Sequence, residues 1–240
     1  MNIQKKIVLT AMLAWFLLSQ GATIKAHNVG WTVSSPGVPG AGIVINGTEG
    51  GGEWAGAYMF NISDYGGGNS LSATVKALHK ADGIYLLIVI TDNTNNNNDA
   101  VQIRFDINHS GNPIQNTDWG MEMRRNGQAT WGQANADPGT WGNIPAGNVG
   151  VSSIAASWTV EVRLPTGAPS GLDLATGTVG IHFMLLDADQ AFGASSAKYT
   201  QWPQPPAMDL NALLDSTPSD WGNYVFDPAT TFPNLAVTGV

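Results

Sequence analysis

Short strand-like segments separated by turn residues are the feature that most constrains how this chain can fold. Apolar and polar residues alternate over residues 101–106 and again over residues 158–164, which is typical of strands with one buried and one polar face. Residues 84–90 (IYLLIVI) are continuously apolar, which predicts a central strand covered on both faces. Clusters of Gly, Asn, Asp and Pro separate such segments. We therefore predict an all-β fold, a two-sheet antiparallel β-sandwich of the immunoglobulin or jelly-roll type with long polar loops.

The composition supports this fold class and narrows the range of functions. Among 240 residues there are 29 glycines and nine tryptophans, and only 12% of the residues are charged, which is unlike a disordered chain or a helical bundle. The chain has no cysteine, which excludes disulfides, thiol nucleophiles and zinc–thiolate clusters. Its formal net charge of −8 repels phosphate backbones, so we expect no nucleic-acid partner.

The N-terminal residues have the features of an export signal. Lys5 and Lys6 precede an apolar run over residues 7–18, and small residues follow up to Ala26, as in a cleaved signal peptide. The run is too short to cross a hydrocarbon core of roughly 30 Å. We expect a signal peptide over residues 1–26, a single domain over residues 27–240, a secreted or periplasmic location and no membrane span in the mature chain. An uncleaved anchor is the alternative.

The sequence shows no constellation typical of an enzyme. Glycoside hydrolysis needs two positioned carboxyl groups, and the four glutamates are not spaced as a pair. Glu161 lies in an alternating segment, where a solvated outer position is expected. A Gly-x-Ser-x-Gly elbow and a phosphate-binding loop are also missing. We therefore expect a protein without catalytic activity of its own.

Two loop clusters rich in Asp and Asn indicate a cation site. Asp92, Asn95 and Asp99 form the first cluster, and Asp187 and Asp189 form the second. Carboxylate and amide oxygens are the ligands that Ca²⁺ prefers, so we predict that these five residues hold a structural Ca²⁺ ion. Turn formation, in which Asn and Asp side chains bond to their own backbone, is the alternative for both clusters.

The tryptophans indicate a sugar ligand. Trp119, Trp131 and Trp141 are each followed by glycine in polar surroundings, and a small neighbour leaves one face of the indole uncovered. Such a ring offers a flat apolar platform with an N–H donor, which suits the C–H face of a pyranose. We expect these rings to be exposed and to gather in one cleft, with burial in the core as the alternative.

Several motifs, taken in order, resemble the family 9 carbohydrate-binding modules and the wider DOMON-like group of β-sandwiches. They span roughly residues 43–227, and Asn46 and Gln102 replace acidic residues of the family pattern. The motifs are Ile45-Asn46-Gly47 with Glu53-Trp54-x-x-Ala57, Asn98-Asp99-x-Val101-Gln102-Ile103-x-x-Asp106, Trp158-Thr159-Val160-Glu161-Val162-x-Leu164-Pro165, Asp187-x-Asp189 and Pro218-x-x-Trp221-Gly222.

The resemblance implies a non-catalytic module that binds sugars or polysaccharide chain ends in an aromatic slot, with structural calcium. It also implies a role in polysaccharide catabolism with a glycoside hydrolase as partner, here a separate chain, because no enzyme domain is recognised in these residues. By position, Gln102 and Arg104 are candidates for contacts with sugar hydroxyls, and Trp202 is a further stacking candidate. The predicted sugar site therefore consists of Gln102, Arg104, Trp119, Trp131, Trp141 and Trp202.

Two other interpretations stay open. The DOMON-like group includes sandwiches that hold haem b and transfer electrons, for which His182 with Met121 or Met123 would be the axial ligands. The third interpretation is an enzyme function, either as an accessory to a glycoside hydrolase or as a copper oxidase that uses His27 as a processed N-terminus beside a second histidine.

Overall fold

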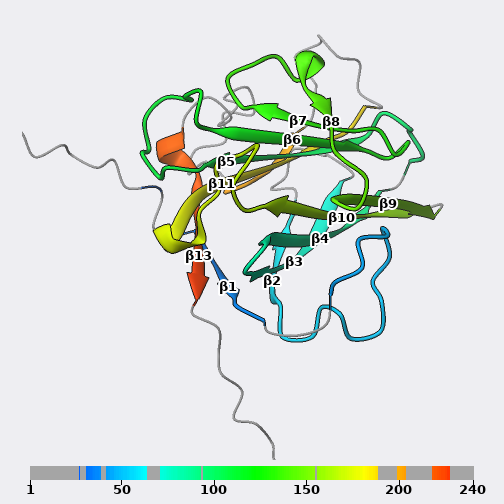
Figure 1. Cartoon of the computed structure of the whole chain (residues 1–240). Helices are drawn as coiled ribbons and strands as arrows, with labels where there is room; N and C mark the ends of the chain where they lie inside the picture. Colours follow the sequence, from blue (N-terminus) through cyan, green and yellow to red (C-terminus); the bar gives the residue numbers. More distant parts are fainter. Residues whose placement is uncertain are drawn as a thin grey trace, which may run out of the picture.

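The computed structural model describes residues 27, 31–38, 42–63, 71–92, 94–154, 156–188, 199–203 and 218–227. These residues form two β-sheets stacked as a sandwich (Figure 1), which confirms the predicted fold class. The predicted signal peptide and Asp189 lie outside the described residues. Three short 3₁₀ helices occur within them: η1 (Pro138–Thr140), η2 (Leu174–Thr176) and η4 (Pro218–Asp220). No helix of the described part is long and apolar enough to cross a membrane.

The larger layer, sheet A, has eight strands in the order β1-β13-β11-β5-β6-β7-β8, and β12 pairs with the last part of β11. All neighbours are antiparallel except β1 and β13, which run parallel. The strands are β1 (Thr32–Pro36), β5 (Ala100–Asp106), β6 (Trp119–Arg124), β7 (Ala129–Gln133), β8 (Gly142–Asn143), β11 (Thr178–Leu186), β12 (Tyr199–Trp202) and β13 (Gly222–Asp227).

The smaller layer, sheet B, has five antiparallel strands in the order β2-β3-β4-β10-β9. Its central strand β4 contains the continuously apolar segment that the sequence predicts to be covered on both faces. The strands are β2 (Tyr58–Ile62), β3 (Ser72–Lys80), β4 (Gly83–Thr91), β9 (Val149–Ile154) and β10 (Ser157–Pro165).

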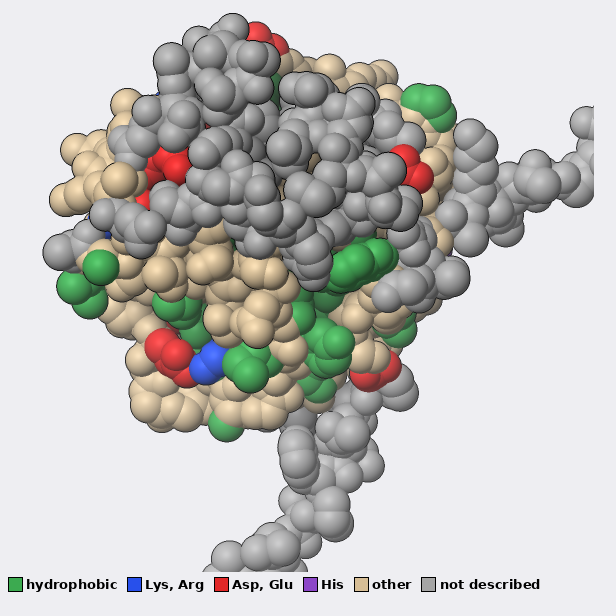
Figure 2. Space-filling model, turned by 180° about the vertical axis from the view of Figure 1, so that it is seen from behind, with side chains coloured by type: hydrophobic (Ala, Val, Ile, Leu, Met, Phe, Trp, Pro, Cys, Tyr) green, Lys and Arg blue, Asp and Glu red, His purple; other side chains and the backbone are tan. Residues whose placement is uncertain are grey.

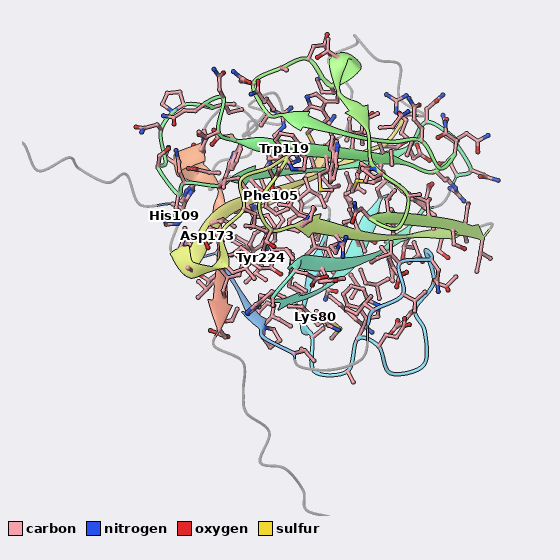
Figure 3. All side chains as sticks on the ribbon, in the orientation of Figure 1. Lys80, Phe105, His109, Trp119, Asp173 and Tyr224 are labelled. Atoms are coloured by element: carbon pink, nitrogen blue, oxygen red, sulfur yellow. The ribbon has the colours of Figure 1, made fainter. Side chains whose placement is uncertain are left out.

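The hydrophobic core lies between the sheets. Alternate residues of β5 and β10, such as Phe105 and Val160, point into it and are fully buried, as the period of two predicts. Figure 3 shows Phe105 and Tyr224 between the two layers. The outward residues of β4 are covered as well, since Tyr85 and Leu87 pack in a second hydrophobic cluster. This confirms the two-sided burial predicted for β4.

A loop over residues 42–57 covers the outer face of sheet B and is visible beneath it in Figure 1. Glu161 of β10 holds this loop in place. Its Oε2 accepts hydrogen bonds from the backbone N–H groups of Asn46 and Gly47, both at 2.8 Å, and its Oε1 accepts one from Trp54 Nε1 at 3.0 Å. The expectation that Glu161 is solvated is therefore wrong, because the covering loop buries it completely.

Candidate functional site

The outer face of sheet A carries a group of polar side chains that we call the outer patch. It consists of Gln102, Arg104, Glu122, His182 and Gln201, which come from β5, β6, β11 and β12. Gln102 pairs with Glu122, and Arg104 with His182; paired residues share one face of a sheet. All five are at most 8% exposed, so each polar atom in the patch must find a partner or remain costly to bury.

Hydrogen bonds inside the patch leave one acceptor unused. Gln102 Nε2 donates to Glu122 Oε2 at 2.6 Å, and Arg124 Nε donates to Glu122 Oε1 at 2.7 Å. Arg104 Nη1 donates to the carbonyl of Ala134 at 3.1 Å. Gln102 Oε1 is buried and has no hydrogen-bond partner in the structure. An unsatisfied buried amide oxygen is uncommon in a native fold, and a ligand hydroxyl is the kind of group that would satisfy it.

His182 is held neutral in the patch. Burial, with a smaller contribution from the positive charge of Arg104, lowers the pKa of His182 to about 3. Its Nε2 lies 3.0 Å from Gln201 Oε1, and its ring stacks on Trp221 at 5.9 Å between ring centroids. Since an amide oxygen only accepts hydrogen bonds, Nε2 carries the proton.

The residues proposed as haem ligands do not fit that role. His182 points to the outer face of sheet A, whereas Met121 and Met123 are fully buried in the core between the sheets. Axial ligands must reach one iron atom from its two sides, and residues on opposite faces of one sheet cannot do so.

Trp141 borders the outer patch, but it is only 8% exposed. Its indole lies against the outer side of β6 and β7, where Gly120 and Gly132 have no side chain in the way. Its Nε1 donates to the carbonyl of Gln133 at 3.0 Å. Gly120 pairs with Arg104, so Trp141 lies on the same face as Arg104 and Gln102. The structure therefore brings three of the six predicted sugar-site residues to one face.

The other three predicted tryptophans lie on the opposite, inner face of sheet A. Trp119 and Trp131 pack edge to face at 6.1 Å, and Trp131 is 8% exposed. Trp202 is 5% exposed and its ring centroid lies 4.8 Å from that of Phe60. Trp119 is partly buried. The expectation of exposed rings in a single cleft is therefore wrong, because residues 119–124 and 129–133 are strands in which tryptophan and glycine point to opposite faces.

The predicted cation cluster is built around an arginine. Asp92 and Asp99 are buried and face Arg125, whose Nη1 lies 2.6 Å from Asp92 Oδ2 and 3.9 Å from Asp99 Oδ2. Asp99 Oδ1 accepts a hydrogen bond from the N–H of Ala188, which places the buried Asp187 next to this cluster. Asn95 is exposed.

A Ca²⁺ ion does not fit between Asp92 and Asp99, because the Arg125 guanidinium already supplies the positive charge there. Within the described residues, no group of three or more His, Asp or Glu side chains is arranged to hold a metal ion. The prediction of Ca²⁺ at Asp187 and Asp189 stays a prediction.

The second histidine that a copper site at His27 would need is present. The rings of His27 and His109 lie 4.3 Å apart, at the end of the sandwich where Figure 3 shows His109. However, Nε2 of His27 bonds to Asp106 Oδ2 at 3.1 Å, and Nε2 of His109 lies 2.9 Å from Asn223 Oδ1. These contacts describe a hydrogen-bonded cluster that anchors His27 to sheet A.

Comparison with known proteins identifies the family. Residues 45–226, more than half of the chain, match the family model described as carbohydrate family 9 binding domain-like. The chain belongs to this family. No match was found among curated proteins.

Two solved structures of family 9 carbohydrate-binding modules from Caldicellulosiruptor kristjanssonii share the fold. The module in complex with cellotriose is 17% identical, with a TM-score of 0.57 over 88% of this chain and 98% of that one. The module in complex with glucose is 16% identical, with a TM-score of 0.59 over 85% of this chain and 98% of that one. The family therefore accounts for the sandwich and for the resemblance seen in the motifs.

Sequence reasoning missed Glu122, Gln201, Arg125 and the role of Glu161 in this family 9 domain. Glu122 stands between two methionines in β6, and this alternation is a usable signal for a polar outer face. Gln201 follows Thr200 in β12, so its strand carries no such signal. Charged side chains are few on the face of the described surface that Figure 2 shows.

Proposed function

We propose that this family 9 domain is an exported, non-catalytic carbohydrate-binding module whose sugar site is the outer patch beside Trp141. Family membership carries the proposal. It is supported by Gln102, Arg104 and Glu122 on one face of sheet A and by the two family 9 modules that hold cellotriose and glucose. Calcium is no part of the proposed recognition.

The chemistry of the patch suits hydroxyl groups. Sugar hydroxyls both donate and accept hydrogen bonds, and the patch offers a free acceptor in Gln102 Oε1 beside the charged donors of Arg104. Glu122, fixed by Gln102 and Arg124, is a further acceptor. Trp141 supplies an apolar wall beside them, in keeping with sites that combine aromatic surface with a few placed polar groups.

Calorimetry with glucose and cellotriose tests the proposal. Gln102→Leu removes the free acceptor and Arg104→Ala removes the donors, and each change is expected to weaken sugar binding by at least roughly tenfold, the equivalent of one or two hydrogen bonds. Arg163→Ala, which lies on sheet B in a partly exposed pair with Asp82, is the matched control and should bind as the unchanged protein does. If neither sugar nor a wider panel of oligosaccharides binds, the proposed function is wrong.

Export and the partner enzyme are separate parts of the proposal. Residues 1–26 have the pattern of a signal peptide, and N-terminal sequencing of the protein recovered outside the cytoplasm should begin near residue 27. Retention of the first residues in the recovered protein would contradict cleavage. A separate glycoside hydrolase is expected to act faster on polysaccharide when this domain is added than when its Arg104→Ala variant is added.

A further inference from the structure

Arg125 occupies the point where loops from both sheets meet. It directly follows β6, and its side chain is fully buried. Its Nη1 contacts Asp92 Oδ2 at 2.6 Å and the carbonyl of Thr94 at 2.8 Å, and it lies 3.9 Å from Asp99 Oδ2. Asp92 and Thr94 follow β4 of sheet B, whereas Asp99 precedes β5 of sheet A. One guanidinium therefore joins the two layers at this end of the sandwich.

The remaining donors of Arg125 extend the connection to β9. Its Nε donates to Ser153 Oγ at 3.0 Å and its Nη2 to the carbonyl of Ile154 at 3.3 Å. The backbone N–H of Arg125 donates to the carbonyl of Asp99 at 2.9 Å. The guanidinium is thus surrounded by two carboxylates, two carbonyls and a hydroxyl.

This set of oxygen atoms is of the kind that binds a hard divalent cation. Two buried carboxylates that face one another repel unless a positive charge lies between them. In this chain the positive charge belongs to a side chain, whose five N–H donors lie in a fixed plane. The guanidinium therefore neutralises the two carboxylates without any exchangeable ion.

We propose that Arg125 is a built-in cation that takes the place of a structural metal ion between Asp92 and Asp99, and that this end of the sandwich is stable without calcium. Residues 94–99 and the end of β9 at Ser153 and Ile154 then keep their arrangement whatever the metal content of the surroundings. Removal of the guanidinium should convert the same oxygens into a site that needs a metal ion. The inference does not depend on sugar binding.

The first test is the thermal midpoint of the unchanged protein with excess chelator and with added Ca²⁺. Neither treatment is expected to act through this cluster, because Ca²⁺ finds no place between Asp92 and Asp99, so any shift caused by an ion held elsewhere should be the same in Asp92→Asn. Calcium binding that raises the midpoint of the unchanged protein and is abolished by Asp92→Asn would overturn the proposal, since the metal would then occupy this cluster. The Asp92→Asn comparison separates this cluster from any ion held elsewhere.

The second test replaces the arginine. Arg125→Ala should lower the midpoint by roughly 10 °C, as expected when one partner of a buried pair is removed from a domain of this size, and added Ca²⁺ should restore several degrees of that loss. Arg163→Ala, which breaks the partly exposed pair with Asp82, is the control and should show a small loss with no response to Ca²⁺. An Arg125→Ala protein that ignores Ca²⁺ would count against the proposal.

A third variant covers the case in which Arg125→Ala does not fold. In Arg125→Gln the two carboxylates remain without a counter-charge, so adding Asp92→Asn to it should raise the midpoint, whereas Asp92→Asn alone should lower that of the unchanged protein. If Asp92→Asn shifts the thermal midpoint in opposite directions in the two backgrounds, the Asp92 carboxylate is paired with the charge of Arg125. Equal destabilisation in both backgrounds would contradict it.

Discussion

The indole of Trp141 lies on the backbone of Gly120, with its six-membered ring where a Cβ atom of residue 120 would be. Gly120→Ala should therefore displace Trp141 from the edge of the outer patch. We expect a loss of about 1–3 kcal/mol in the free energy of unfolding, typical of overpacking, and a clear loss of sugar affinity by calorimetry.

The matched control for this change is Gly142→Ala, because a Cβ at residue 142 meets no atom within 4 Å. It should leave both sugar affinity and stability unchanged. If Gly120→Ala binds sugar as the unchanged protein does, Trp141 is no part of the sugar site.

Glu161 should contribute strongly to stability although it lies far from the outer patch. Its carboxylate accepts three N–H donors from the loop over residues 42–57. Glu161→Gln places an amide NH₂ group against at least one of these donors, and hydrogen bonds to charged groups are among the stronger ones. Denaturation in urea should show a loss of about 2–4 kcal/mol in the free energy of unfolding.

Glu49→Gln is the control for the Glu161 variant, since Glu49 is about half exposed in its pair with Lys76. Surface pairs of this kind contribute at most about 1 kcal/mol. Equal effects of the two substitutions would mean that the loop is held by its apolar contacts alone.

Local periodicity predicted the strands and their core residues, but not what covers their outer faces. The alternation over residues 101–106 and 158–164 reports a feature of each strand by itself. The burial of Glu161 depends instead on a loop more than a hundred positions earlier in the chain. The burial of Arg125 depends on the connection between β4 and β5 and on the end of β9. No local pattern carries such information.

The tryptophans show how an adjacent glycine can be misinterpreted. Glycine after Trp119 and Trp131 was expected to leave those rings bare, but in a strand the next residue points to the opposite face. The outer face, to which the two glycines belong, is covered by Trp141, whose indole packs over Gly120 and Gly132. The pairing of β6 with β7 brings the two glycines together, and this register was not available from composition.

His182 should make the protein less stable in acid. Its folded pKa is about 3, whereas an unfolded histidine titrates near about 6.5. Between these values the unfolded chain binds the additional proton, so the free energy of unfolding falls as the pH drops below about 6.5. His182→Gln should flatten this part of the curve of thermal midpoint against pH. An unchanged acid slope would show that other groups dominate it.

Asp118 should act in the opposite direction. Burial, opposed in part by the N–H of Gln115, raises the pKa of this carboxyl to about 6, above the value of about 3.9 for an unfolded aspartate. The folded chain therefore binds the proton more tightly, and this group's contribution to stability decreases as the pH rises from about 4 to about 6. Asp118→Asn keeps an oxygen that can accept the Gln115 N–H and removes the buried charge. The variant should be more stable than the unchanged protein at pH 7.5, by at most about 3 kcal/mol, and equally stable at pH 4, where the carboxyl is protonated. Urea denaturation at both pH values measures this, and a variant less stable at pH 7.5 would show that the Asp118 charge has a favourable partner.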